Sequence, residues 1–461
     1  MGKDLGYDIN GIKKVVSHGE YFGDSLGQFA LNSITVLAGQ LTYFYTNKIG
    51  MAAATAGTVL LVAKIVDAVT DLFMGKIVDR TETKRGKARP WLLWMIAPTM
   101  LAIILLFTIP HASDGAMAGY GVLTNIFASA ICYTAIAVPY YTMISYKTKS
   151  GEEAGKFGTY RSAVGYSVGI AIGIGLIPIT NMLGGDQRAW IIIACVFAAI
   201  SGIGLYIAYK TSKERYVETG AAQEKEKNVS IIDGLKILVH NKYWLKITGV
   251  GVAINIMYAM IMAAPVYYAL YVLGNDNMVS LINTVNIIPS ILGFMTTGYL
   301  LKKFGLTKTA RLACVIGIFG AAVRCFFPGN LMVTLVFGSV VMYATIPLIS
   351  CLPAMVLRTS EVNMKTAGVR ITGMTNASNS FAGKIGSGLG GAAIGWILAF
   401  GGFDAAAAVQ TSAVTTAVYA INIYIPLAMF ILAFVILMKY DLDEKYETLV
   451  EENTVAEPVE A

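Results

Sequence analysis

Residues 62–80 read VAKIVDAVTDLFMGKIVDR, and the charges inside this stretch decide what the fold must accommodate. Lys64, Asp67 and Asp71 stand within an apolar run that has no turn residue to bring them into water. Burying one unpaired charge costs several kcal/mol, so a chain retains such charges when they serve a function. The solvent that surrounds them is therefore the first thing to establish.

The composition of the chain is that of a membrane protein. Of its 461 residues, 56% are hydrophobic and 14% are charged, and the mean hydropathy is +0.63. A soluble protein carries roughly 25% charged residues. The five cysteines stand singly in apolar stretches, which indicates reduced packing residues. The first residues contain no apolar core followed by a cleavage site, so we predict no removable signal.

Apolar segments of the length that crosses a bilayer, about 20 residues each, recur along the chain. They predict an all-α membrane protein with twelve transmembrane helices, six on each side of a polar linker. Within that linker, VSIIDGLKILVHN is predicted to form an amphipathic helix, either interfacial or an ordinary cytoplasmic cap. The predicted spans lie near 25–46, 55–78, 90–110, 117–146, 158–183, 189–209, 244–272, 278–301, 311–327, 331–357, 371–400 and 412–438. The predicted domains are an N-terminal bundle (1–210), the linker (211–242), a C-terminal bundle (243–440) and an acidic cytoplasmic tail (441–461).

Lysine and arginine residues set the orientation of the spans. They gather in alternate loops such as DRTETKRGKARP, whereas the loops on the opposite face carry almost none. The positive-inside rule then places both termini in the cytoplasm, with the chain in the inner membrane of the cell. Topology also explains the net charge of +7. We therefore predict no nucleic-acid partner, and the expected partners are the lipid bilayer and a small molecule.

The two halves of the chain resemble each other weakly, since GKIVDRTETKRG begins at Gly75 and GYLLKKFG begins at Gly298. Internal symmetry of this kind is typical of transporters built from two related halves. No Walker sequence for ATP is present, and the three histidines lie apart from one another and from paired cysteines. The sequence therefore favours a transporter that is not an enzyme and needs no cofactor.

Five stretches keep their order through nearly the whole chain: FYTNKIG, VAKIVDAVTDLFMGKIVDRTETKRGKARPW, YTAIAVPYY, TYRSAVGY and FAGKIGSGLGGAAIGWIL. With them the chain resembles the major facilitator superfamily, and within it the glycoside-pentoside-hexuronide:cation symporters, the family of melibiose permease. The resemblance implies two six-helix bundles around a central cavity and secondary active transport. It further implies Na⁺ or H⁺ as the coupling ion and a glycoside, oligosaccharide or hexuronide as the substrate. We expect the chain to act as a monomer.

The resemblance gives the charges of 62–80 a role. On a helix, Lys64, Asp67 and Asp71 fall within an arc of roughly 60°, so they face one cavity. Two carboxylates with one ammonium group leave a net negative site that suits Na⁺, Li⁺ or H⁺. The cation site implied by the resemblance consists of Asp67, Thr70, Asp71 and Thr134, although melibiose permease has Asn at the position of Thr70. The alternative is a buried salt bridge that only holds this helix to its neighbours.

The substrate site is also implied by the resemblance. Arg161 and Lys384 match pocket positions of the family, one in each half, as alternating access requires. Ala137 stands where an acidic sugar-binding residue is expected. The first span lacks a matching acid, and Gln28 is its nearest candidate. The predicted substrate residues are Gln28, Lys64, Tyr140, Tyr141, Arg161 and Lys384.

Without those acids, Arg161 and Lys384 leave surplus positive charge, which favours a carboxylate-bearing glycoside such as a hexuronide. The alternative is that each base pairs with an unseen acid or a backbone carbonyl. Asp79 and Arg80, at the cytoplasmic end of the second span, are predicted to act in gating. Two other functions stay open: symport of a lysolipid or other amphiphile on the same fold, and a membrane enzyme or receptor without transport.

Overall fold

The computed structural model describes residues 6–8, 11–216, 236, 238–367, 372–407, 409–443 and 445. Within these residues the regular elements are helices, with only two isolated β-bridges beside them. The chain divides into two compact units. The first unit contains 1–222 and 403–409, and the second contains 223–402 and 410–461. The predicted domain boundaries stay a prediction, and most of the predicted linker helix lies outside the described residues.

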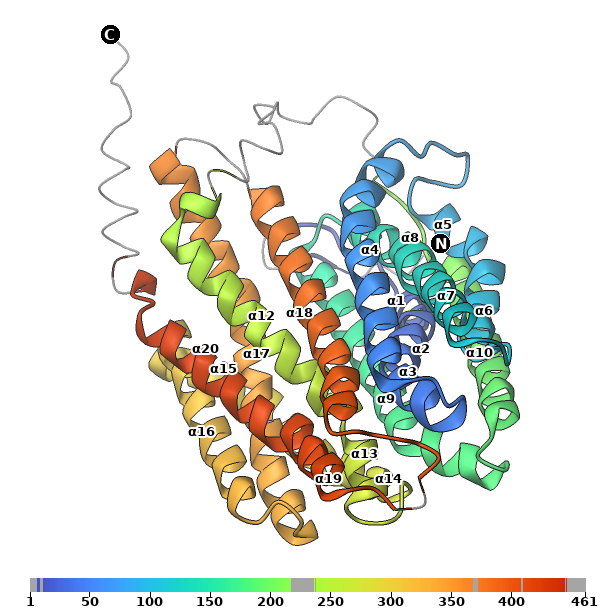
Figure 1. The fold of residues 1–461 in the computed structure, drawn as a ribbon. Helices are drawn as coiled ribbons and strands as arrows, with labels where there is room; N and C mark the ends of the chain where they lie inside the picture. The colour runs from blue at the N-terminus through green and yellow to red at the C-terminus, as the bar shows by residue number, and fades with distance from the viewer. Residues whose placement is uncertain are drawn as a thin grey trace. The chain divides into compact units, whose positions relative to one another are not determined.

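The first unit is built from helices that run from blue to green in Figure 1. Several of them follow one another directly and form longer, interrupted rods. Its elements are α1 (His18–Ser25), α2 (Gln28–Gly39), α3 (Leu41–Tyr43), η1 (Phe44–Lys48), α4 (Ala53–Asp79), α5 (Arg89–Trp94), α6 (Ile96–Leu105), α7 (Asp114–Asn125), η2 (Ile126–Tyr133), α8 (Thr134–Lys147), α9 (Gly151–Met182) and α10 (Gln187–Thr211).

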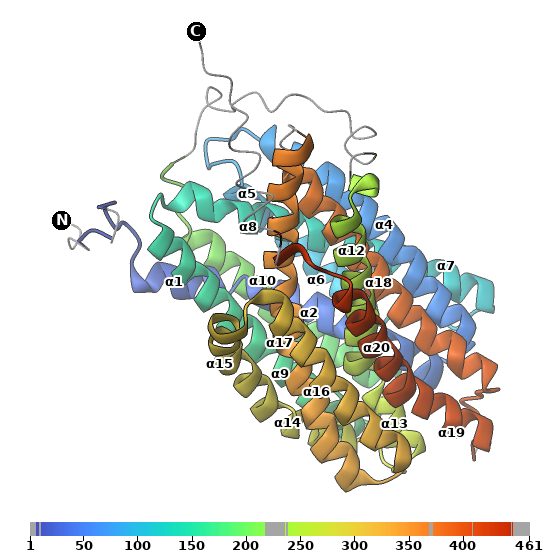
Figure 2. The ribbon, with the colours of Figure 1, turned by 90° about the vertical axis from the view of Figure 1, so that its left-hand side faces the viewer.

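The second unit is built in the same way, and its α16 and α17 lie side by side in two views at right angles (Figures 1 and 2). Its elements are α12 (Lys242–Ala263), α13 (Pro265–Tyr271), α14 (Met278–Val285), α15 (Ile287–Phe304), α16 (Leu306–Phe326), α17 (Leu331–Ala367), α18 (Thr372–Phe400), α19 (Ser412–Tyr419), η3 (Ala420–Tyr424) and α20 (Ile425–Met438).

Nine helical stretches among the described residues are long and apolar enough to cross a membrane. The other three predicted spans are also helical, but they are interrupted or are less apolar than the nine. The span predicted near 25–46 is broken into α1, α2, α3 and η1, and the one near 90–110 is broken into α5 and α6. The span predicted at 371–400 corresponds to α18. The all-helical fold is confirmed, and the count of twelve stays a prediction.

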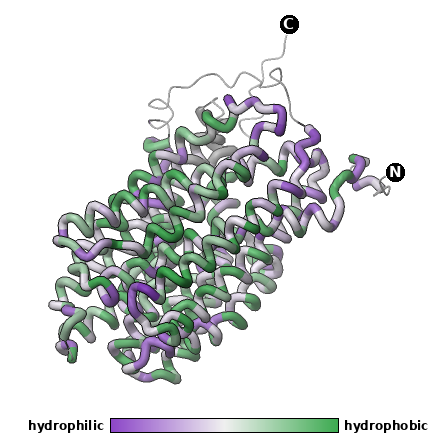
Figure 3. Tube along the Cα trace, turned by 90° about the vertical axis from the view of Figure 1, so that its right-hand side faces the viewer, coloured by the Kyte–Doolittle hydropathy of each residue, from purple (hydrophilic) through white to green (hydrophobic). Residues whose placement is uncertain are grey.

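Local sequence explains where many of these helices begin and end. Ser150, Asp186, Asn241 and Thr411 each precede a helix and accept a hydrogen bond from a backbone amide of its first turn. Such side chains satisfy amides that have no partner inside the helix. Gly305 ends α15 with a φ of 77°, a conformation that costs little only for glycine. In Figure 3 the hydrophobic colour follows the helices, and the hydrophilic colour gathers at their ends and in the loops.

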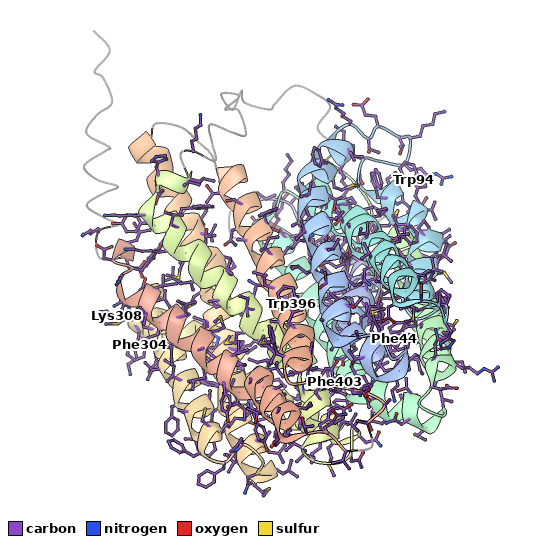
Figure 4. The ribbon with its side chains drawn as sticks, in the orientation of Figure 1. Phe44, Trp94, Phe304, Lys308, Trp396 and Phe403 are labelled. Carbon is purple, nitrogen blue, oxygen red and sulfur yellow. The ribbon has the colours of Figure 1, made fainter. Side chains whose placement is uncertain are left out.

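The core of the first unit contains an aromatic cluster. The Phe44 ring, labelled in Figure 4, lies 5.0 Å from that of Phe107 and 5.2 Å from that of Trp190 between centroids. All three residues are buried. The cluster joins η1 with α10 and with the residues that follow α6. It thereby fixes three predicted spans against one another beside the charged helix α4.

Each unit also has a contact at its helix ends in which an acid and an arginine tie two helices together. In the first end contact (Arg89, Tyr209, Glu214), Glu214 accepts hydrogen bonds from the amides of Lys87, Ala88 and Arg89. The Nε of Arg89 donates to the carbonyl of Tyr209 at 2.9 Å. The carboxylate therefore caps the start of α5 from the chain that follows α10.

The second end contact (Arg311, Leu437, Asp443) has the same composition. Asp443 accepts from the amide of Thr307 at 2.8 Å and pairs with Arg358. The Nε of Arg311 donates to the carbonyl of Leu437 at 3.0 Å. The start of α16 is thereby joined to the end of α20.

Candidate cation and substrate site

The charges of 62–80 lie on α4 as the helical spacing predicts. Asp67 is buried, with 1% of its surface exposed, and its Oδ2 lies 3.1 Å from the Nζ of Lys64 one turn away. The Lys64 side chain is about one-third exposed. Lys64 therefore pairs with Asp67.

Thr134 connects the two carboxylates of α4. Its Oγ1 donates to Asp71 Oδ1 at 2.7 Å and lies 3.3 Å from Asp67 Oδ1. One hydroxyl proton serves one carboxylate at a time, so the shorter contact to Asp71 is the hydrogen bond. Thr134 is the first residue of α8 and follows η2, a π-helical stretch. The wider turns of a π-helical stretch change the direction in which the side chains after it point, relative to a regular α-helix. Such stretches are frequent at functional sites.

The remaining predicted cation residue, Thr70, uses its hydroxyl differently. It donates to the backbone carbonyl of Asp67 at 3.0 Å, within its own helix. Its part in cation binding stays a prediction. Tyr133, which is not among the predicted cation residues, directly precedes Thr134 at the end of η2.

The arrangement offers oxygen ligands to a small cation. Two carboxylates and a hydroxyl converge, and hard monovalent cations and protons bind to such oxygens. Nowhere in the described part of the chain do three His, Cys, Asp or Glu side chains gather in a way that would hold a metal ion.

Arg161 of α9 is buried, with 2% of its surface exposed, and it has an acidic partner. Its Nε donates to Asp24 Oδ2 at 2.7 Å and its Nη2 donates to Asp24 Oδ1 at 3.0 Å. Asp24 lies on α1 and is fully buried. Arginine and carboxylate groups in this two-bond geometry form a strong and directional pair.

A second base joins the same carboxylate. Lys147, the last residue of α8, is fully buried, pairs with Asp24 and donates to the Oγ of Ser212 at 2.7 Å. The span predicted near 117–146 ends just before Lys147, but α8 extends through it, so Lys147 is a helix residue and not a loop residue. The cluster of Asp24, Lys147 and Arg161 carries one acid against two bases.

An acid does lie at the start of the first predicted span, although its match to a sugar-binding position stays untested. Asp24 precedes Gln28 by one turn, and it stands between glycines in the polar start of the span, FGDSLG. The structure therefore supports the alternative in which Arg161 pairs with an unseen acid. Among the three side chains of this cluster, one positive charge is in excess.

The predicted tyrosines have different surroundings. Tyr140 is buried, donates from its Oη to the carbonyl of Asp24 at 2.7 Å and lies 3.6 Å below the Arg161 guanidinium. It holds the ion pair in place. Tyr141 is about half exposed, and its Oη accepts from Gln28 Nε2 at 3.5 Å. Gln28 and Tyr141 thus lie together, next to the buried ion pair.

Three predicted residues are not joined to this site by the described contacts. Lys384 lies on α18 in the second unit, and its action together with Arg161 stays a prediction. The side chain of Asp79, the last residue of α4, lies outside the described residues. Arg80 follows it and is exposed. Gating by this pair stays a prediction.

A known protein family matches almost the whole chain. Residues 24–444 match the family model described as MFS/sugar transport protein. The chain belongs to this family. The MFS/sugar transport proteins are multi-pass membrane transporters, so the chain is not an enzyme, and the predicted resemblance to the glycoside and cation symporters of this superfamily is confirmed.

Named relatives cover almost the whole of this family member. An isoprimeverose transporter of Lactiplantibacillus pentosus is 29% identical over 443 residues, which are 94% of this chain and 90% of the relative. A glucuronide carrier protein homolog of Escherichia coli (strain K12) is 27% identical over 453 residues, which are 93% and 94% of the two chains. A crystal structure of the nucleoside transporter NupG matches with a TM-score of 0.62 at 13% identity and covers 91% of this chain and 99% of that one, which shows a shared fold.

Proposed function

We propose that the chain is a cation-coupled symporter that carries a glycoside, an oligosaccharide or a hexuronide across the cytoplasmic membrane, with Na⁺ or H⁺ as the coupling ion. The observation that carries this proposal is the convergence of Asp67, Asp71 and Thr134 on one point. Here two acids share a hydroxyl, and Lys64 pairs with one of them.

Coupling follows from the charge balance of this cluster. A cation that binds between Asp67 and Asp71 neutralises carboxylate charge and competes with Lys64 for Asp67. The cost of burying the cluster in a closed state falls when that charge is neutralised. Closure is then favoured when the cation is bound, and the cation gradient can drive the substrate.

The substrate class is proposed from the second cluster. The Nη1 atom of Arg161 is buried and has no hydrogen-bond partner among the described residues. A sugar hydroxyl or carboxylate oxygen is an acceptor of the kind this atom lacks. The excess positive charge of Lys147 and Arg161 over Asp24 favours a substrate that carries a carboxylate. The two relatives are named for isoprimeverose and, as a homolog, for glucuronides, and both sugars are therefore candidates.

Uptake into proteoliposomes tests the proposal. Purified wild-type protein and Asp71→Asn are reconstituted, and uptake of radiolabelled isoprimeverose and of methyl glucuronide is followed under a Na⁺ gradient or a proton gradient. We expect the wild type to accumulate at least one sugar under one gradient and Asp71→Asn to lose accumulation. Asp114→Asn, at the exposed start of α7, is the matched control. Undiminished accumulation by Asp71→Asn contradicts the proposed coupling.

A further inference from the structure

Arg324 lies in the last turn of α16 in the second unit, and it is buried with 8% of its surface exposed. Its Nη1 donates to the backbone carbonyl of Asn422 at a long 3.3 Å. Its Nε is buried and has no hydrogen-bond partner in the part of the chain that the structure describes. The guanidinium group therefore leaves a strong donor unused inside the bundle.

The membrane-spanning stretch of the chain around Arg324, residues 241–440, contains few acids that could balance this charge. Between residues 241 and 440 the sequence contains only Asp276, Glu361 and Asp404. No ion pair of Arg324 occurs among the described residues. Arg161 in the first unit, by contrast, has Asp24 in a two-bond pair.

Glu361 is excluded as a partner by its distance along α17. Near its end, α16 packs closely against α17 at Phe337. The evidence is the space beside Gly320, where an added Cβ would lie 3.1 Å from the Phe337 carbonyl oxygen. Glu361 follows Phe337 by 24 positions in the same helix. At 1.5 Å per residue this places it about 35 Å further along the helix.

The groups near Arg324 are dipoles without charge. Asn422, in the π-helical stretch η3, donates its amide to the carbonyls of Ala264 and Val418 at 3.2 and 3.0 Å. Tyr268 acts electrostatically on Arg324, and its Oη already donates to the Pro328 carbonyl at 2.8 Å. None of these groups cancels a full positive charge.

An arginine cannot relieve this situation by losing its proton, because its guanidinium stays charged in proteins. An uncompensated buried ion costs several kcal/mol. Because no described acid pairs with Arg324, an anion from outside the chain would balance its charge and accept from its unused Nε. We propose that Arg324 holds a monovalent anion, a halide ion or a small carboxylate, between the end of α16 and η3. This anion site requires no transport and can be tested whether or not the chain is a symporter.

Thermal unfolding of the purified full-length protein in detergent tests the site. Chloride replaces isethionate, a bulky reference anion, at constant total salt and pH. We expect the unfolding midpoint to rise with chloride and to saturate, since a ligand that binds only the folded state stabilises it by mass action. A parallel titration with acetate distinguishes a carboxylate site from a halide site. Equal midpoints in all three anions overturn the proposal.

Two variants locate the effect. Arg324→Met removes the charge, and its unfolding midpoint should not respond to the anion. Arg188→Met, an exposed arginine at the start of α10, should keep the full wild-type response. An unchanged response in Arg324→Met overturns the assignment to this residue.

If Arg324→Met does not fold, the wild type alone still decides the question. Crystals grown in bromide should show an anomalous scattering peak within hydrogen-bonding reach of the Arg324 guanidinium. Bromide peaks elsewhere and none at Arg324 refute the site.

Discussion

The two units share a structural contact but differ in their internal charges. Each has an end contact in which an arginine Nε donates to a helix-end carbonyl and an acid accepts from a helix-start amide. Inside the helices the likeness ends. The first unit buries Asp24 and Asp67 with basic partners, whereas the buried Arg324 of the second has no ion pair among the described residues.

This difference shows which features a repeated architecture retains. An end contact satisfies backbone amides and carbonyls, which every helix presents at its termini whatever it carries inside. A buried carboxylate is costly and survives where it has a ligand or a partner. The architecture is therefore common to both units, and the chemistry of cation binding is proposed for one of them.

The largest expected effect comes from removing the acid of the first unit's buried ion cluster. Asp24→Asn leaves Lys147 and Arg161 buried without a counter-charge and should lower the free energy of unfolding by about 3–5 kcal/mol. Lys147→Met is the matched control, since it keeps the Asp24–Arg161 pair and should cost much less. Thermal melting in detergent measures both. Equal stability of Asp24→Asn and the wild type would contradict the expectation that Asp24 neutralises Lys147 and Arg161. The buried charges of the first unit would then be no better stabilised than Arg324 of the second unit.

Breaking the end contacts should give intermediate effects of unequal size. Glu214→Ala removes an acceptor from three backbone amides and should cost about 2–3 kcal/mol. Asp443→Ala removes one amide contact and the pair with Arg358, and should cost about 1–2 kcal/mol. Melting temperatures of the two variants rank them.

A third variant breaks the Glu214 contact from the opposite side. Gly86 has a φ of 112°, and a Cβ added there would lie 2.4 Å from Glu214 Oε2. Gly86→Ala should therefore destabilise the protein to a similar degree as Glu214→Ala. If Asp443→Ala lost more stability than Glu214→Ala and Gly86→Ala, the end contact of the second unit would be the stronger one, contrary to this expectation.

A smaller effect is expected for cation affinity. Thr134→Val removes the hydroxyl that donates to Asp71, which is worth about 1.4 kcal/mol and hence about tenfold in the cation concentration for half-maximal uptake. Thr134→Ser keeps the hydroxyl and should stay near wild type. Thr345→Val alters a buried threonine of the second unit, whose hydroxyl contacts only the Val341 carbonyl in the described structure, and should leave cation dependence unchanged. Equal shifts in the two Val variants would refute a special role for the first unit.

The smallest effect is expected at an exposed ion pair. Asp441 and Lys445 lie 2.6 Å apart with both side chains partly exposed, and the hydrogen bond from Lys445 lowers the pKa of Asp441 below its usual value. Asp441→Asn should change stability by less than about 0.5 kcal/mol. A lowered pKa means that the contribution exists above the ordinary pKa and is lost as the pH falls through the lowered one. A melting curve that moves by several degrees between wild type and variant at pH 7 contradicts this expectation.

The sequence predicted the cation cluster in part. The placement of Lys64, Asp67 and Asp71 on one helix face follows from local periodicity, and α4 has it. The contribution of Thr134 came from the family resemblance. Its position depends on the π-helical stretch before it, and that distortion arises from how the helices pack rather than from a local signal.

The substrate cluster was predicted less well for a related reason. Asp24 and Arg161 are separated by 137 positions, and nothing in the spacing of either stretch specifies that they meet. Lys147 carries the signal of a loop base, since it stands near the end of a span beside other charged residues. Only the fold turns it inward, onto the same carboxylate.

By itself the sequence determined that the chain is a helical membrane protein with charges on one face of its second predicted span. Composition and helical spacing are local properties, and the bilayer leaves few alternatives for an apolar chain. The tertiary structure decided which charges are neutralised and by which partner. A carboxylate's state depends on groups brought to it from distant segments, and here Arg161 and Lys147 reach Asp24 while Arg324 meets only dipoles.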